Sequence, residues 1–259
     1  MIPPHRSGLA RWSDLRSYTP ARVALGRAGH GLPTRAHLAF QAAHAAARDA
    51  VHADLDVPSL RADLQKVGLD SVTAHSAATD RLTFLLRPDL GRRLSDADRA
   101  ALPHAPGAML FVVCDGLSAT AVERHAGPLL DRVIAPLQAE GPIAPVVIAL
   151  QGRVALGDEI GEAMRAEAVA VLIGERPGLT AADSMGVYLT WAPRVGRTDA
   201  ERNCISNIRP DGMPIPAAAD KLLWLIRAMR QLQRTGIELK DEQPAALPGG
   251  GTNGLQAIR

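Results

Sequence analysis

Two glycines, Gly152 and Gly157, have the spacing of the glycines in a P-loop, where backbone N–H groups bind the phosphates of a nucleoside triphosphate. A P-loop continues with Lys and then Ser or Thr, which neutralise the phosphates and bind Mg²⁺. In this chain Asp158 and Glu159 stand at those two positions. Because a negative pair repels phosphate, the sequence argues against an ATPase.

Other motifs with a known mechanism are also missing. No G-x-G-x-x-G follows the first expected strand, so a dinucleotide site is disfavoured. The residues around Ser118 read DGLSAT, which is not the G-x-S-x-G of a nucleophile elbow, and H-E-x-x-H does not occur. With no complete set of acid, base and nucleophile, we expect a chain that binds a ligand and has no catalytic residues of its own.

Metal chemistry is equally poorly supported. The two cysteines, Cys114 and Cys204, are too few for a disulfide framework or a four-cysteine zinc site, and we expect both to be buried or half-buried thiols. His37 and His44 lie two turns apart on an expected helix, but no carboxylate or third histidine stands beside them at metal spacing. We therefore interpret them as partly exposed helical histidines and expect no metal site.

The composition is that of an ordinary globular protein. Hydrophobic residues make up 47%, charged residues 22%, and the net charge is only +2. Aromatic residues, at 3%, are too few for a base-stacking surface, so we expect no nucleic-acid partner. No apolar stretch is long enough to span a membrane, and residues 1–12 lack the apolar core of a secretion signal. These features predict a cytoplasmic protein.

The elements that must position any site fall into two regions. Residues 1–106 are predicted to be a helical N-terminal region, with helices near 34–52, 60–67 and 96–102 and a basic loop at 87–94. From residue 107 to 259, apolar strands alternate with amphipathic helices, which is typical of βαβ units. The expected strands are 108–116, 144–152, 168–176 and 187–193, and the helices start near Thr120, cover 158–165 and run over 216–234. The fold class is thus α/β, with a Rossmann-like, open, mostly parallel sheet flanked by helices.

In such sheets, ligands bind outside the carboxyl ends of the strands. This rule selects four segments: the loops 115–118, 152–157 and 174–178, and the polar stretch that contains Cys204. Function should be sought in these segments.

The same segments resemble those of the small subunits of ethanolamine ammonia-lyase. The resemblance is carried by DGLSA at 115–119, QGRVALGDEIGE at 151–162, GERPGL at 174–179 and ERNCISNIRPDG at 201–212, with TPARVALGRAG at 19–29 and RPDLGRRL at 87–94. It spans about residues 19–241. Some family members have a longer N-terminal extension than this chain, so no targeting role is carried over.

The resemblance implies a lyase that converts ethanolamine to acetaldehyde and ammonia by adenosylcobalamin radical chemistry. It implies a hetero-oligomer in which a large barrel subunit holds the substrate and the small subunit, inactive alone, covers the cobalamin at the interface. It places cofactor contacts at Val154, Glu175 and Cys204: an apolar contact, a hydrogen-bond acceptor, and a small polarizable surface or backbone group without a cobalt–sulfur bond.

One observation on the cofactor is independent of these contacts. The Asp-x-His-x-x-Gly sequence of base-off cobalamin proteins does not occur, so cobalamin is expected to keep its own base on cobalt. A self-sufficient Rossmann-like nucleotide-cofactor enzyme and a purely structural subunit are the alternatives. The stoichiometry and enclosure in a bacterial microcompartment stay open.

Overall fold

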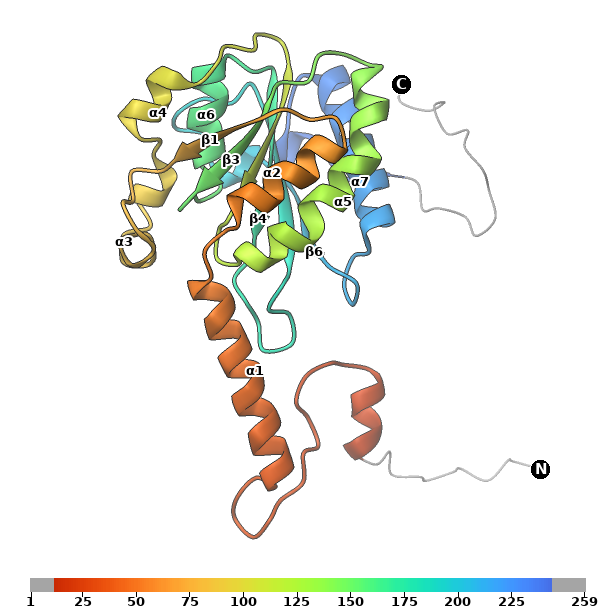
Figure 1. Ribbon diagram of the computed structural model, residues 1–259. Coiled ribbons are helices and arrows are strands. Elements are labelled where there is room, and N and C mark those ends of the chain that lie inside the picture. The colour runs from red at the N-terminus through yellow and green to blue at the C-terminus, as the bar shows by residue number, and fades with distance from the viewer. Residues whose placement is uncertain (1–11, 244–259) are drawn as a thin grey trace, which may run out of the picture.

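The computed structural model describes residues 12–243 (Figure 1). Residues 1–11 lie outside this range. The prediction that residues 1–12 carry no secretion signal therefore concerns residues that lie almost entirely outside it. The described chain is an α/β protein built on one six-stranded sheet. Its strands are β1 (Ser71–His75), β2 (Met109–Cys114), β3 (Val146–Leu150), β4 (Ala168–Gly174), β5 (Met185–Trp191) and β6 (Asn203–Ile208).

Seven α-helices accompany the strands within residues 12–243. They are α1 (Thr34–His52), α2 (Val57–Lys66), α3 (Arg81–Leu86), α4 (Asp96–Ala101), α5 (Ala119–Gln138), α6 (Leu156–Met164) and α7 (Ile215–Leu232), with short 3₁₀ turns between some of them. The predicted helix 34–52 is confirmed with its bounds, and the other predicted helices and the four predicted strands are present with ends shifted by a few residues. All six residues of β2 are buried, as a continuous apolar run predicts.

The sheet is mixed, and the expectation of a mostly parallel, Rossmann-like sheet is correct for only part of it. The strand order is β1-β3-β2-β4-β5-β6; the first four strands are parallel, whereas β5 and β6 run antiparallel to their neighbours. A parallel crossover needs a dozen or more residues, usually with a helix. Only residues 175–184 connect β4 to β5, and they contain no helix. The chain therefore reverses direction after β4, and β5 pairs antiparallel with it.

Two strands were not predicted. The region before residue 106 was expected to be helical or irregular, but β1 lies in it and pairs along its whole length with β3. The polar stretch with Cys204 was expected to be a loop, but it forms the edge strand β6. Both are short and only partly apolar, so they give little periodic signal. The division of the chain at residue 106 stays a prediction, and the pairing of β1 with β3 crosses it.

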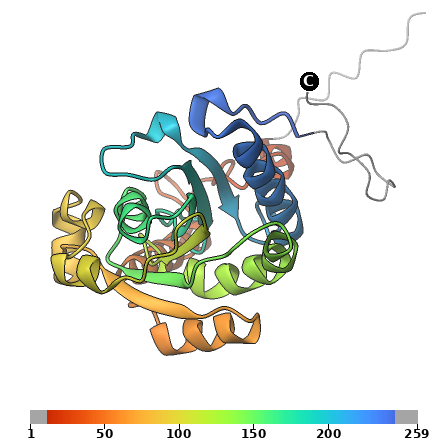
Figure 2. The same ribbon diagram turned by 90° about the horizontal axis from the view of Figure 1, so that it is seen from above.

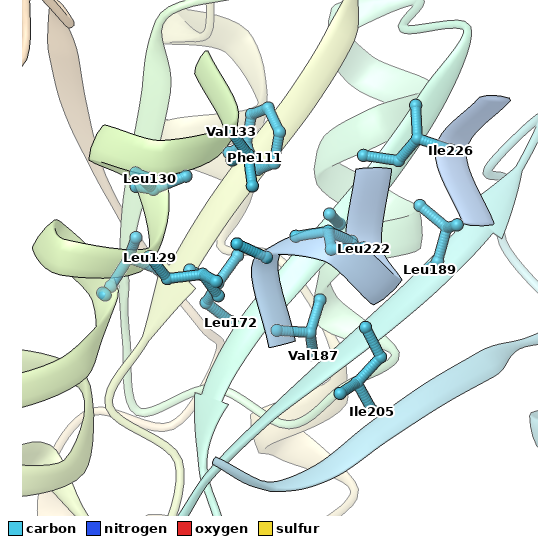
Figure 3. Close-up of a cluster of buried hydrophobic side chains, with 14 of the residues drawn as sticks. Phe111, Leu129, Leu130, Val133, Leu172, Val187, Leu189, Ile205, Leu222 and Ile226 are labelled. Carbon is cyan, nitrogen blue, oxygen red and sulfur yellow. The ribbon is translucent and has the colours of Figure 1, made fainter. Parts of the chain in front are cut away.

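Helices cover both faces of the sheet (Figure 1, Figure 2). On one face, α2, α5 and α7 form a large apolar cluster with the strands, in which Phe111, Leu129, Leu172 and Leu222 meet (Figure 3). The other face carries α4 and α6, with a smaller cluster that includes Ile160. We call this second side the α6 face. The two clusters hold the strands rigidly and so fix the loops at their ends.

The helix α1 extends away from this body (Figure 1). Leu38 and Phe40 on it are 56% and 40% exposed, and Ala50 is its one buried residue. None of the helices in residues 12–243 is both long and apolar enough to cross a membrane.

Candidate ligand-binding site

Asp115 joins the carboxyl ends of the neighbouring strands β2 and β3. Its buried carboxylate accepts hydrogen bonds from the backbone N–H groups of Gly116 (2.8 Å), Gln151 (2.9 Å) and Gly152 (3.1 Å), and from Arg81 Nη1 (3.3 Å). Burial raises the pKa of Asp115, and these donors act in the opposite direction. The carboxylate therefore serves to hold the loops after β2 and β3 together, with no atom left over for a ligand.

The crevice beside β2 is filled by backbone. The helices that follow β2 and β3, α5 and α6, lie on opposite faces of the sheet, so ligands would ordinarily bind between β2 and β3, where Asp115 holds the two loops together. The gap between β2 and β4 is closed as well. Here Leu117 N–H donates to the Gly174 carbonyl (2.9 Å), and a Cβ on Gly174 would collide with the carbonyl oxygen of Ser118. Any ligand must therefore sit farther along the edge.

Glu175 lies at the end of β4 and is half-buried. Its carboxylate accepts hydrogen bonds from Ser184 Oγ (2.5 Å), from Ser206 Oγ (2.6 Å) and from the backbone N–H of Asn207 (3.3 Å). These partners come from the residue before β5 and from β6, so Glu175 links the parallel and antiparallel parts of the sheet. The bonds fix the orientation of the carboxylate at the sheet edge.

Cys204 lies on the α6 face of the sheet. The strand register places Val171, Tyr188 and Cys204 in one row across β4, β5 and β6, and Val171 belongs to the core cluster of α6. The Tyr188 hydroxyl lies beside the Cys204 thiol. Neighbouring atoms partly shield both groups from water, and this desolvation raises the pKa of both, although Cys204 as a whole residue is exposed. The expectation of a buried or half-buried thiol is confirmed for Cys114 but wrong for Cys204, which is exposed on the edge strand β6.

Val154 lies on the same side of the sheet as Cys204 but comes from a different part of the chain. It lies in the loop between β3 and α6, is half-buried, and packs against the same cluster as Tyr188. Val154, Tyr188 and Cys204 therefore share the α6 face, and Glu175 bonds to Ser206 of the exposed strand there. Tyr188 and Ser206 were missed in the sequence, because an alternating strand pattern around them was the one signal available.

The acidic pair after Gly157 has a structural role. Asp158 is buried and forms two hydrogen bonds of 2.7 Å with Arg202, and Glu159 pairs with Arg99. Both carboxylates are thereby neutralised inside the fold.

Other candidates lie away from this edge. His37 and His44 are exposed on α1, as predicted, and residues 12–243 contain no group of three potential ligands that could hold a metal ion. A shallow hollow bordered by Trp191, Thr235 and Ile237 lies at the opposite end of β5, and no predicted site residue lines it.

The fold and this edge define a class: α/β proteins with a half-open sheet face bordered by loops at the carboxyl ends of the parallel strands. Residues 9–240 match the family model of the ethanolamine ammonia-lyase light chain (EutC). The chain belongs to this family.

Curated relatives agree with the match along nearly the whole chain. The ethanolamine ammonia-lyase small subunit of Xanthomonas campestris pv. campestris strain B100 is 54% identical over 255 residues, covering 96% of this chain and 94% of the relative. The protein of the same name from Azotobacter vinelandii strain DJ is 54% identical, covering 93% and 92%. The one from Ralstonia nicotianae strain GMI1000 is 55% identical, covering 89% and 88%.

Proposed function

We propose that this chain is the cobalamin-covering small subunit of an adenosylcobalamin-dependent ethanolamine ammonia-lyase, and that it acts only in complex with a large subunit. The relatives' name, small subunit, supports the partner. The observation that carries the proposal is that Val154, Tyr188 and Cys204 lie on the same face of the sheet, and that Glu175 bonds to Ser206 of the edge strand β6.

The residues present fit such a cofactor. The half-buried Val154 and Tyr188 offer an apolar surface to a corrin ring, and the carboxylate of Glu175, already oriented by Ser184 and Ser206, can accept hydrogen bonds from side-chain amides. Exposed Cys204 adds a small contact of low polarity. The absence of an Asp-x-His-x-x-Gly sequence supports base-on binding, in which the cofactor keeps its own base on cobalt.

The geometry supports a division of labour between this chain, the cofactor and the large subunit. Bound adenosylcobalamin supplies the radical chemistry, and this chain orients the cofactor and excludes water from its covered side. Because Asp115, Asp158 and Glu159 are occupied by hydrogen bonds and ion pairs, none of them is free to act as a general acid or base. Ethanolamine would then be bound by the large subunit.

Co-expression with an ethanolamine ammonia-lyase large subunit tests the proposal. The purified complex should bind hydroxocobalamin stoichiometrically, as measured by absorbance, and release acetaldehyde from ethanolamine when given adenosylcobalamin. The isolated chain should do neither. Stoichiometric NAD or ATP binding by the chain alone would instead favour a self-sufficient enzyme. A complex whose cofactor affinity is unchanged by substitutions of Val154, Glu175 and Cys204 would favour a structural subunit. Cytoplasmic location, with or without a bacterial microcompartment, belongs to the proposal and is tested by cell fractionation.

A further inference from the structure

Arg153 is held in a fixed position beside Val154. Its guanidinium carbon lies 4.2 Å from the centroid of the Phe84 ring, and its backbone N–H donates to the Gly91 carbonyl (2.7 Å). Gly91 must be small here, because a Cβ would lie 2.9 Å from the Phe84 ring and 3.1 Å from Arg153 Cγ. The ring and the glycine together define where the guanidinium can be.

This positioned cation has no counter-charge in the described chain. No hydrogen bond or ion pair from its side chain to another of residues 12–243 is formed, and its Nε is buried without a partner. Its charged neighbours are arginines: Arg81, whose guanidinium carbon lies 4.8 Å from the same Phe84 ring, together with Arg92 and Arg176. Burial and these like charges lower the pKa of Arg153.

The neighbouring carboxylate cannot supply the missing charge. Asp115 is occupied by Arg81 and three backbone N–H groups. A half-buried cation without a partner destabilises the folded chain. Such an unpaired group is explained when a bound ligand supplies the missing negative charge. A guanidinium with free N–H groups, surrounded by further positive charge, matches a phosphate oxygen pair in shape and charge.

We infer that Arg153 is an anion-binding residue of the cofactor site and that its ligand is the phosphodiester in the nucleotide tail of cobalamin. The inference rests on the proposed function. It adds a charged contact to the apolar contact at the adjacent Val154. A carboxylate on the large subunit is the competing source of negative charge, and the two make different predictions for a corrinoid that lacks phosphate.

The test uses the complex of this chain with the large subunit, and two probes: hydroxocobalamin, and cobinamide, which lacks the phosphate and the base. Arg153→Met keeps an apolar stem over Phe84 and removes the charge. It should weaken hydroxocobalamin binding by about 10- to 100-fold, the loss expected for charge-assisted hydrogen bonds. Cobinamide binding should change by less than about twofold, and Arg153→Lys should fall between wild type and Arg153→Met.

Arg132→Met on α5 is the matched control, because Arg132 is exposed, on a helix of the opposite face, and the charge change is the same. It should affect neither probe. Equal losses for both probes, no loss for either, or weakened subunit assembly without cofactor would each overturn the phosphate assignment while leaving the proposed function intact. A wild-type complex that binds neither probe would overturn the proposed function itself.

Discussion

Asp158 and Arg202 form a buried, bidentate ion pair, in which Arg202 Nη1 and Nη2 donate to the two different carboxylate oxygens, each over 2.7 Å. Their side chains are 3% and 2% exposed. Asp158 lies in the first turn of α6, and Arg202 immediately precedes β6. The pair therefore fixes the helix that follows Val154 against the strand that carries Cys204.

Breaking this pair should destabilise the protein strongly. Arg202→Met leaves the Asp158 carboxylate buried without its partner, and we expect a loss of about 3–5 kcal/mol in the free energy of unfolding. Urea unfolding measures it. Arg87→Met, which removes an exposed pair with Asp89, should cost less than about 1 kcal/mol. The double variant Asp158→Leu/Arg202→Met should regain most of the loss, and a double variant as unstable as the single one would contradict this account.

Glu175→Ala should weaken cobalamin binding to the assembled complex by about 1–3 kcal/mol, because a fixed hydrogen-bond acceptor is lost. The dissociation constant for hydroxocobalamin measures the effect, and Glu238→Ala, at an exposed glutamate outside this site, is the control. Urea unfolding of both variants separates binding from stability. Unchanged cofactor affinity in Glu175→Ala would remove Glu175 from the site.

Gly174→Ala should be among the most damaging small substitutions. The added methyl group would meet the backbone of Ser118 and of Asp115, which cannot rotate away as a side chain can. We expect a loss of about 3 kcal/mol in the free energy of unfolding. Gly178→Ala, where the nearest atoms are 3.9 Å from the added Cβ, should be tolerated. Equal stability of the two variants would show that the loops after β2 and β4 can separate.

Thiol labelling should distinguish the two cysteines. In the native protein Cys204 should react with iodoacetamide and the buried Cys114 should not, whereas both should react in denaturant. Because partial desolvation of the thiol raises the pKa of Cys204, its labelling should be slow near neutral pH and accelerate as the pH rises. Mass spectrometry of the labelled peptides measures this. Bound cobalamin in the complex should protect Cys204, and labelling at the same rate with cofactor would argue against a contact.

His125 should make stability depend on pH. Its side chain is 8% exposed, and burial lowers its pKa in the native state, with Arg124 acting in the same direction and Asp183, 3.9 Å away, opposing. The unfolded chain, with a histidine pKa near 6.5, binds the proton more readily. Stability should therefore be constant above about pH 6.5 and fall below it. Urea unfolding between about pH 7.5 and 5.5 should show this slope in wild type and a shallower slope in His125→Gln.

The sequence by itself determined the α/β class, four of the six strands and most of the helices, because apolar runs and amphipathic periods depend on neighbouring residues in the chain. It also determined the family, since motifs such as those at 151–162 and 201–212 are read directly. It pointed to the loops of Val154 and Glu175 through the rule that ligands bind at the carboxyl ends of strands.

The tertiary structure decided how these parts meet. Whether β5 and β6 run parallel or antiparallel depends on chain reversal, which no local pattern encodes, and this reversal brings Ser206 to Glu175 and exposes Cys204. The acidic residue Asp158 reads as a phosphate-repelling group in sequence and is a structural partner of Arg202 in space. Arg153 is one arginine among many in the sequence, and only the packing of Phe84 and Gly91 around it shows a positioned cation without a partner. Each of these features is a contact between residues far apart in the chain, so it exists only once the chain has folded.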